Sequence, residues 1–491
     1  MGDIAESLEV PLMHDKQNEV IEISCNLQGG NESGSAICSK DVGRRILQES
    51  NKIWAIAGPA IFSRIAMYGT NVVTQAFAGH IGDLELAAIS IASTVIVGFN
   101  FGLFLGMGSA LETLCGQAFG ARKYHLLGLY MQRAWIVLFG VAILLLPMYI
   151  FATPILKILG QPDDIAELTG KVSIWFIPQH FSFVFLFPVQ RFLQSQLKNM
   201  VIAWISAATL VLHVFLSWLF IIKLDMGLIG SAMTLNLAWW LPPIALILYA
   251  TCGGCPLTWT GLSRYAFTDL WSFAKLSAAS GVMLCLENWY YRILVLLTGN
   301  LPDSEVAVDS LSICMSINGW EMMIPLGFFA ATGVRVANEL GAGNGKGARF
   351  AVIVSATTST VIGLVFFLLI IVLRQEFALA FTSSSTILEA VSKLSILLSF
   401  TVLFNSIQPV LSGVAVGSGW QSYVAYINIG CYYVIGIPFG VILGWVFKQG
   451  VLGIWTGMIC GTAVQTIILA FIVYRCDWDR EAAQAIDRVS E

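Results

Sequence analysis

The sequence predicts an all-α polytopic membrane protein, with twelve transmembrane helices arranged as two homologous six-helix bundles. Three observations support this prediction: an apolar composition, apolar segments of membrane-spanning length, and an internal repeat. Of the 491 residues, 57% are hydrophobic and 11% are charged, whereas soluble domains carry about 25% charged residues. The core of a soluble domain of this length could not hide so much apolar surface, so we expect the lipid bilayer as a partner.

Twelve apolar stretches of about 20 residues follow a polar start, and each is long enough to cross ~30 Å of hydrocarbon at about 1.5 Å per residue. The strands of a membrane barrel would be about half as long and would alternate in polarity, so these stretches are predicted to be helices. The expected spans lie near residues 53–78, 86–113, 128–151, 172–190, 200–222, 227–250, 270–297, 307–334, 350–373, 390–416, 421–446 and 451–474.

The connections between the spans predict the orientation. The first and seventh connections contain no Lys or Arg, whereas the second contains Arg122 and Lys123 and the eighth contains Lys346 and Arg349. An even number of spans places both termini on one side of the membrane. The positive-inside rule therefore predicts that both termini are cytosolic.

Self-similarity shows that the chain has two related halves. The segment "LCGQAFGARK" matches "RVANELGAGNGK", and "VQRFLQS" faces "IQPVLSG", at an offset of about 220 residues. Each half contains an even number of spans, so the repeat is parallel, with its axis along the membrane normal. Two such bundles that move about a central cleft are suited to alternating access. The repeat therefore favours a transporter over a channel.

The domain boundaries follow from the repeat and from the polar ends. We expect a disordered cytosolic N-terminal tail over 1–50, an N-lobe over 51–250, a cytosolic linker over 251–269, a C-lobe over 270–474 and a cytosolic C-terminal tail over 475–491. The polar start has no apolar run behind basic residues, so it is not a signal peptide. One chain contains both halves of the expected cleft, so we expect it to function as a monomer.

The glycine-rich stretch "GAGNGKGAR", Gly341 to Arg349, resembles a phosphate-binding loop. A Walker loop needs G-x-x-x-x-G-K-[ST], but Leu340 and Gly347 occupy two of its fixed positions. The stretch is therefore predicted to be a turn. The net charge of −4 says nothing about nucleic acid, but no basic stripe suggests it, so we expect no nucleic-acid partner. The sequence contains no metal-ligand cluster, nucleophile–base pair or cofactor motif, so we expect neither an enzyme nor a cofactor.

Several blocks, among them "SALETLCGQAFGA", "CLENWYY", "VRVANELGAGN" and "QPVLSGVAVGSGWQ", resemble the multidrug and toxic compound extrusion (MATE) family. The resemblance covers about residues 50–475 and implies a V-shaped architecture of two lobes. The polar tail and "GSGWQ" resemble the plant DETOXIFICATION branch, whose members move organic compounds against a proton gradient. Within it, "ENWYYRILVL" and "SINGWEMMIPL" resemble the group with flavonoid transporters of the vacuole.

Glu287 is the leading candidate for the proton-coupling residue. A carboxylate in the middle of a span costs several kcal/mol, so it is a functional candidate by default. Asn288, Trp289 and Tyr290 follow it and offer hydrogen bonds and stacking faces to a substrate. The resemblance agrees, because eukaryotic members carry a coupling Glu at the matching place. The alternative is a permanent ion pair with Arg292.

Two positions depart from the family pattern. Many relatives have an acid near Arg292, and they often have Asp where this chain has Asn405. The permanent positive charge of Arg292 would suit an anionic substrate. The missing acid at Asn405 leaves the proton stoichiometry open.

Other polar residues in the spans are candidates for the substrate cavity. Tyr68, Asn71 and Gln75 lie on one helix face, and either line the cavity or join helices. Gln408 and Asn405 form a similar pair. Glu321, beside Trp320, either lines the cleft or is hydrogen-bonded between helices. These alternatives stay open.

Three residues are assigned gating or structural roles. Glu112 ends the second span, where gating or pairing with Arg122 or Arg133 is expected rather than substrate contact. Pro59 and Gly281 are candidate kinks at matching places in the two halves. Bending there would change the volume of the cavity.

Together these observations predict a proton-coupled antiporter that moves flavonoid-like or other organic solutes from the cytosol into the vacuole or out of the cell. The vacuolar membrane is favoured and the plasma membrane is the alternative. One rival is a passive chloride channel of the same fold, suggested by Arg292 and Asn405. The other is a sodium-coupled antiporter, which would need more oxygen ligands than this lobe supplies.

Overall fold

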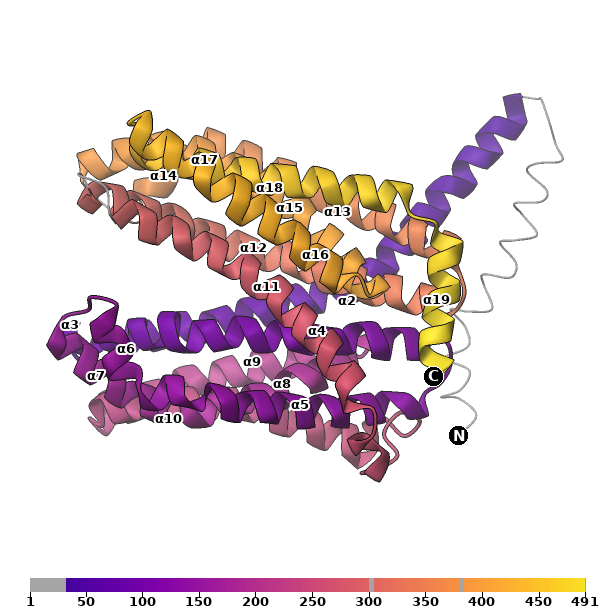
Figure 1. Cartoon of the computed structure of the whole chain (residues 1–491), viewed down its shortest axis with the longest axis horizontal. Helices are drawn as coiled ribbons and strands as arrows, with labels where there is room; N and C mark the ends of the chain where they lie inside the picture. The colour runs from indigo at the N-terminus through magenta and orange to yellow at the C-terminus, as the bar shows by residue number, and fades with distance from the viewer. Residues whose placement is uncertain (1–31, 300–303, 380, 382–383, 491) are drawn as a thin grey trace. The chain divides into compact units, whose positions relative to one another are not determined.

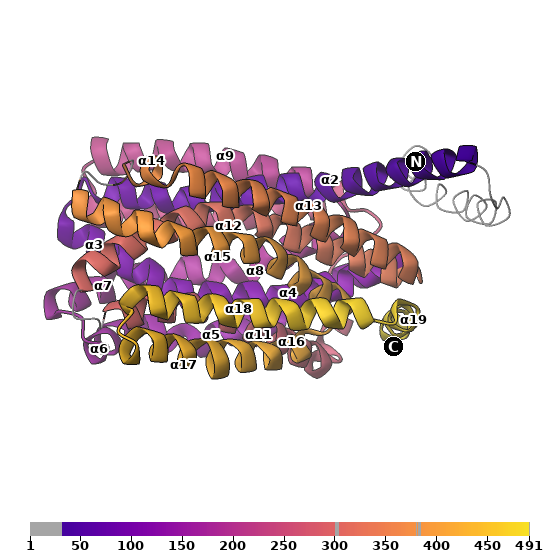
Figure 2. The ribbon, with the colours of Figure 1, turned by 90° about the horizontal axis from the view of Figure 1, so that it is seen from above.

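The computed structural model describes residues 32–299, 304–379, 381 and 384–490. They fall into two compact units, residues 1–52 and residues 53–491, which are considered separately. Within the described ranges every regular element is helical. In the second unit the long helices run roughly along one common direction, as two perpendicular views show (Figures 1 and 2).

Helical segments cover each of the twelve expected spans. The helices of the first half are α2 (Glu32–Ala78), α3 (Asp83–Ile91), η1 (Ala92–Val97), α4 (Gly98–Gly120), α5 (His125–Ile150), α6 (Ala152–Ile158), α7 (Asp163–Trp175), α8 (Ile177–Ser195), α9 (Asn199–Ser217), η2 (Trp218–Lys223), α10 (Gly227–Tyr249) and η3 (Ala250–Gly254). Those that follow are η4 (Arg264–Phe267), α11 (Leu270–Gly299), α12 (Ser304–Gly341), α13 (Gly345–Val372), α14 (Arg374–Leu379), α15 (Ser385–Ser418), α16 (Gln421–Asn428), η5 (Ile429–Gly436), α17 (Ile437–Val441), η6 (Ile442–Val446), α18 (Gly450–Arg475) and α19 (Trp478–Ser490).

Among the described residues, nine helices are long and apolar enough to cross a membrane, and there are ten if the bent pair α7–α8 is one span. The helices at the expected first and seventh spans, α2 and α11, are not among them. Both carry polar or charged side chains, such as Arg64 in α2 and Glu287 in α11, which lower their hydropathy. The polytopic all-α class is confirmed.

The ends of the chain contain more helix than the sequence suggested. Helix α2 begins at Glu32, inside the range expected to be a disordered tail, and residues 1–31 lie outside the described residues. Helix α19 occupies most of the expected C-terminal tail. Its buried side chains are Trp478, Ala482, Ala485 and Val489. Their spacing of three and four residues gives one apolar face, which explains why this short segment folds onto the bundle.

The internal repeat is visible in the backbone. Arg122 and Gly343 have φ angles of 60° and 76°, and Leu197 and Gly419 have φ angles of 63° and 85°. Each pair has the offset of about 220 residues found in the sequence. The stretch "GAGNGKGAR" is the turn between α12 and α13. The Asn344 side chain caps α13 by accepting a hydrogen bond from the Gly347 amide at 2.9 Å, which confirms the predicted turn.

The two halves pack tightly where α4, α12 and α15 end. Thr113 Oγ1 donates to the Val416 carbonyl at 2.5 Å, and Gln117 Nε2 donates to the Gly417 carbonyl at 3.0 Å. A side chain at Gly120 would collide with the Asn338 carbonyl oxygen. Only a glycine lets these backbones approach so closely.

Helix α19 contacts both halves at this end. Arg488 Nη1 donates to Gln117 Oε1 of α4 at 3.0 Å and to the Ser418 carbonyl of α15 at 3.3 Å. Lys123 Nζ donates to the Val489 carbonyl at 3.2 Å. Burial lowers the pKa of Arg488, but an arginine side chain stays charged in proteins. Helix α19 thus links α4 to α15, two helices that are about 300 residues apart in the chain.

Candidate functional site

Glu287 lies in α11 with its carboxylate turned toward α15 and α16. Its Oε1 accepts hydrogen bonds from Gln408 Nε2 at 3.0 Å, Ser412 Oγ at 3.2 Å and Asn428 Nδ2 at 3.2 Å. The side chain is partly exposed. Two neighbouring helices of the second half, α15 and α16, thus position one carboxylate through neutral groups. Gln408, a candidate for the substrate cavity, is thus a hydrogen-bond partner of Glu287.

A second layer of hydrogen bonds holds these partners. Asn428 Oδ1 accepts from Gln465 Nε2 at 2.8 Å, and the Tyr432 hydroxyl donates to Gln465 Oε1 at 2.8 Å. The Tyr432 ring stacks on Tyr290, with ring centres 4.3 Å apart. The orientation of the Asn428 amide is therefore fixed, so that its NH₂ faces Glu287.

Sequence reasoning missed four of these residues: Ser412, Asn428, Tyr432 and Gln465. Each is a polar or aromatic residue in an apolar span, and that is the only signal that the sequence carries for them. Tyr290, expected in the cavity, is instead a core residue. It is fully buried, and its hydroxyl donates to the Met458 carbonyl at 2.8 Å.

Arg292 is not the partner of Glu287. Its Nη1 donates to the carbonyl oxygen of Thr94 in η1 at 2.6 Å, and its side chain is exposed. Segment η1 is a π-helix, a form that often marks functional sites. The described part of the chain contains no ion pair between Arg292 and a carboxylate. The alternative of a permanent Glu287–Arg292 pair is therefore wrong for this structure.

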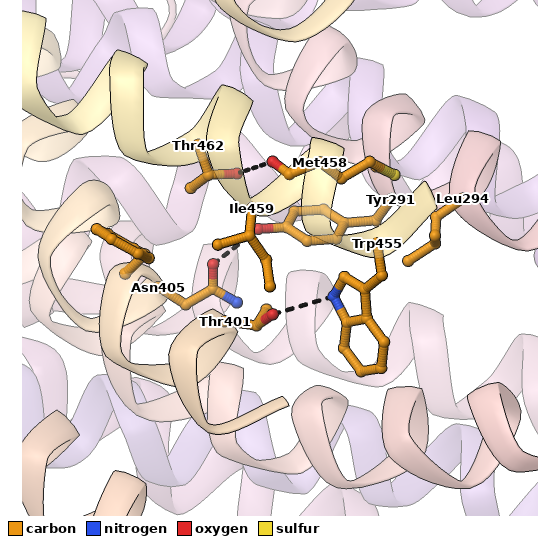
Figure 3. A pocket seen from close by; sticks show the side chains of 9 residues that line it. Tyr291, Leu294, Thr401, Asn405, Trp455, Met458, Ile459 and Thr462 are labelled. Atoms are coloured by element: carbon orange, nitrogen blue, oxygen red, sulfur yellow. Dashed lines mark hydrogen bonds between the residues drawn. The ribbon is translucent and has the colours of Figure 1, made fainter. Parts of the chain in front are cut away.

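Asn405 lines a pocket of the second half that contains about 260 Å³ of unfilled space (Figure 3). Its Oδ1 accepts from the Tyr291 hydroxyl at 2.7 Å, and its Nδ2 donates to Asn318 Oδ1 at 3.1 Å. Figure 3 shows Tyr291 reaching across to Asn405, with Trp455 hydrogen-bonded to Thr401 beside them. Asn405 thus joins α11 to α12 through a chain of neutral hydrogen bonds.

The predicted aromatic residues lie where the halves meet. The rings of Tyr68 and Trp320 are 4.7 Å apart, and those of Phe99 and Trp289 are 5.0 Å apart. Trp289 and Trp320 are 40% and 43% exposed. Asn288 is also exposed. Each pair contains one ring from each half, so both halves contribute to the accessible aromatic surface.

The polar stripe of the first half does not line the second pocket. Asn71 and Gln75 are partly exposed. The pocket contains about 340 Å³ of unfilled space and is lined by Ala66, Met67, Thr70, Leu186, Gln190, Ser206, Thr209, Ala238, Trp239 and Pro242. The stripe residues are not among them, so this pocket lies on another face of α2.

Glu112 pairs with a partner that the sequence did not suggest. Its Oε2 lies 2.8 Å from Arg191 Nη1, and the pair is buried. Arg64 adds a second positive charge nearby. Arg133 instead pairs with Asp269 at 3.7 Å. The expected pairing with Arg122 or Arg133 is wrong because Glu112 faces the interior of the bundle, where α8 supplies Arg191.

The two predicted kinks have local packing roles. Pro59 lies inside α2, and its carbonyl accepts from Ser63 Oγ at 2.8 Å. Gly281 packs on Gly106 of α4, where a Cβ on Gly106 would lie 2.8 Å from the Gly281 Cα. Glu321 is buried, as described below.

A helical membrane bundle built from two repeated halves, with carboxyl groups buried in both, is typical of secondary transporters. The model of the MatE family matches residues 59–219 and 279–442. The chain therefore belongs to the MatE family of transporters, and it is not an enzyme.

The relatives are plant proteins. The chain is 67% identical over 448 residues to Protein DETOXIFICATION 27 of Arabidopsis thaliana, which covers 91% of this chain and 92% of that protein. It is 60% identical over 489 residues to Protein DETOXIFICATION 28 of the same plant, covering 99% and 96% of the two chains. The resemblance to the DETOXIFICATION branch is thereby confirmed.

Solved structures agree in fold. The crystal structure of the eukaryotic MATE transporter AtDTX14 is similar with a TM-score of 0.86 and 35% sequence identity, covering 90% of this chain and 99% of that one. The Vibrio cholerae MATE transporter VcmN, in its bent form, has a TM-score of 0.78 at 17% identity, over 90% of this chain and 99% of that one. The second likeness concerns the fold alone.

Proposed function

We propose that the protein is a proton-coupled antiporter in which Glu287 binds the coupling proton. The supporting observation is that the carboxylate is surrounded by the neutral donors Gln408, Ser412 and Asn428. No fixed positive charge among the described residues holds it in the ionised form. Amide and hydroxyl groups can serve a carboxylate or, after rotation, a neutral carboxyl group. The site therefore suits a group that takes up and releases a proton.

Proton binding would set the direction of transport. Protonation of Glu287 from the acidic compartment removes its charge and loosens its hydrogen bonds with α15 and α16. That change lowers the affinity for solute on the acidic side and releases it there. Deprotonation toward the cytosol restores the three hydrogen bonds and resets the site.

The cargo that fits best is a planar aromatic solute. The exposed rings of Trp289 and Trp320 offer stacking faces, and aromatic pairs of this kind stabilise a contact by about 0.5–1.5 kcal/mol beyond the buried area. Arg292 uses one donor on Thr94 and retains others for a phenolate or carboxylate. Flavonoid-like solutes, or other secondary metabolites and xenobiotics, combine a planar ring with such groups.

The vacuolar membrane is the favoured location and the plasma membrane is the alternative. We infer that both termini are cytosolic from the basic residues in the connections. The segment "EVPLM", Glu9 to Met13, which faintly resembles a vacuolar sorting signal, lies outside the described residues. We also propose that the monomer is functional, since one chain supplies both halves.

The geometry disfavours sodium as the coupling ion. Two of the three groups around Glu287 Oε1 are NH₂ donors, whose hydrogens would face a cation. Ser412 adds a single oxygen. In the described ranges no group of three or more His, Cys, Asp or Glu is placed to hold a metal ion. Sodium prefers several oxygen ligands, so the proton is the better candidate.

The test is uptake of a labelled flavonoid glycoside into proteoliposomes under an imposed pH gradient. We expect gradient-dependent uptake by the wild type and loss of that dependence in Glu287→Gln. Glu389→Gln is the matched control, because Glu389 is exposed and pairs with Lys393 at 2.9 Å. Chloride flux that ignores the pH gradient and is unchanged in Glu287→Gln would establish the passive channel instead.

A further inference from the structure

Glu321 is a buried acid that has no partner among the described residues. It lies in α12 and is 5% exposed, and neither carboxylate oxygen has a hydrogen-bond partner there. No ion pair joins it to a described Lys, Arg or His. The sequence left two roles open for Glu321: lining a cleft, or forming a hydrogen bond between helices. Its burial and its unpaired carboxylate oxygens fit neither role in this conformation.

The setting of Glu321 differs from those of Glu112 and Glu287. Glu112 is matched by the positive charge of Arg191, and Glu287 accepts three hydrogen bonds. An ionised carboxylate without water, donors or a countercharge is strongly disfavoured, and such a group takes up a proton instead. We therefore expect Glu321 to be neutral in this conformation.

Glu321 lies beside the polar chain that contains Asn405. Asn318, three residues earlier in α12, shares its helix face and accepts a hydrogen bond from Asn405 at 3.1 Å. Asn405 accepts from the Tyr291 hydroxyl. Tyr291 in turn follows Glu287 by one helical turn. Tyr291, Asn405 and Asn318 thus form a chain of polar side chains from the helix of Glu287 to the helix face of Glu321.

The groups that face Glu321 would not hold it in the ionised form. Helix α11 contributes the Tyr291 hydroxyl, which donates to Asn405. Tyr68 of α2 packs on Trp320 and Gly319, the residues that precede Glu321. Helix α15 contributes the neutral Asn405. Helices α4, α13 and α15 supply no described cation that pairs with Glu321.

We propose that Glu321 is a second proton-binding residue of the transport cycle. It alternates between the neutral, buried form described here and an ionised form reached when water enters the pocket beside Tyr291 and Asn405. On ionisation the O–H bond of the carboxyl group breaks and the proton is accepted by that water, and the reverse transfer restores the neutral form. The inference rests on the proposed proton-coupled antiport and extends it from one proton to two.

Infrared difference spectroscopy of the purified full chain measures the protonation of the carboxyl groups directly, without a solute. The carboxyl C=O band is followed from about pH 5 to about pH 9, a range that brackets physiological pH. We expect one pH-dependent component to disappear in Glu321→Gln and a different one in Glu287→Gln. A Glu321 component that does not change with pH would overturn the inference, because the group would then be permanently neutral.

The coupling ratio gives an independent test. Proteoliposomes are clamped at zero membrane potential, and the gradient of a labelled, uncharged flavonoid glycoside is measured when flux stops. In the wild type this gradient should vary with the square of the proton gradient, and in Glu321→Gln with its first power. Glu321→Asp should restore the dependence on the square of the proton gradient, and Glu389→Gln should leave that dependence unchanged.

The outcomes separate this inference from the proposed function. A wild type without any dependence on the pH gradient contradicts proton antiport, while the infrared result still reports on Glu321. A coupled wild type whose exponent is unchanged in Glu321→Gln contradicts only the second proton. Size-exclusion profiles of each variant establish that it folds.

Discussion

Arg191 and Glu112 form an ion pair at 2.8 Å whose side chains are only 3% and 0% exposed. The pair joins α8 to α4 inside the first half. Glu112 also abuts Gly333 of α12, where any side chain would collide with its carboxylate. A charged pair thus lies directly against the second half.

Glu112→Gln should strongly destabilise the protein. It leaves Arg191, with Arg64 nearby, without a countercharge, and loss of one partner of a buried pair costs about 3–5 kcal/mol. The measurement is the thermal unfolding of purified protein in detergent, followed by tryptophan fluorescence. The double variant Glu112→Gln, Arg191→Met should recover part of the loss. A melting temperature of Glu112→Gln equal to that of the wild type would contradict the role of the pair.

Arg292→Gln should reduce the preference for anionic cargo. We expect the ratio of KM values for a flavonoid and its sulfate ester to change about tenfold, or about 1.4 kcal/mol. Arg292→Lys should retain part of the preference, because it keeps the charge but loses the planar fork of donors. Lys393→Gln is the control. If KM for both probes shifts equally, Arg292 acts through its bond to Thr94 and does not select the charge.

Arg488→Ala should loosen the end where the two halves meet. The substitution removes hydrogen bonds to Gln117 and to the Ser418 carbonyl, and a bond from a charged donor contributes about 1.5–3 kcal/mol. Hydrogen–deuterium exchange read by mass spectrometry should therefore accelerate in residues 113–120 and 416–421. Arg480→Ala, an exposed position of the same helix, should leave exchange unchanged. Equal exchange in both variants would show that α19 does not hold this end closed.

Gly120→Ala should destabilise the closed packing of α4 on α12. The added methyl group meets the Asn338 carbonyl, which cannot rotate away, and overpacking of this kind costs about 1–3 kcal/mol. The matched control is Gly140→Ala in α5, where nothing lies within 4 Å of the new Cβ. That control should be neutral or slightly stabilising. Thermal unfolding of the two variants checks the difference, and similar melting temperatures would count against tight packing at Gly120.

The positions of the helices were predictable because the bilayer demands long apolar segments, and helices occupy nearly all of each of the twelve expected ranges. Glu287 was predictable for the same reason, since an acid in such a segment is conspicuous. Its partners Ser412 and Asn428 were not. Which polar residues face a given carboxylate depends on how α11, α15 and α16 rotate and pack, and spacing within one helix does not contain that information.

Tyr290 illustrates the limit within a single helix. The sequence grouped it with Trp289 because both follow Glu287. Successive residues of an α-helix point about 100° apart, so Trp289 is 40% exposed while Tyr290 is fully buried. Arg292 was likewise assigned to Glu287 by its nearness in the chain, whereas its bond is to Thr94 of the other half.

The matched left-handed turns have a consequence for engineering. At two of them the first half has Arg122 and Leu197, while the second half has Gly343 and Gly419 in the same conformation. A residue with a side chain tolerates this conformation at a cost of about 1–2 kcal/mol, which glycine avoids. The residue at a turn in one half therefore suggests a substitution at the matching turn of the other half. Leu197→Gly, for example, would introduce the residue type found at the matching position Gly419. A duplicated gene has preserved the path of its backbone while the residues along that path diverged.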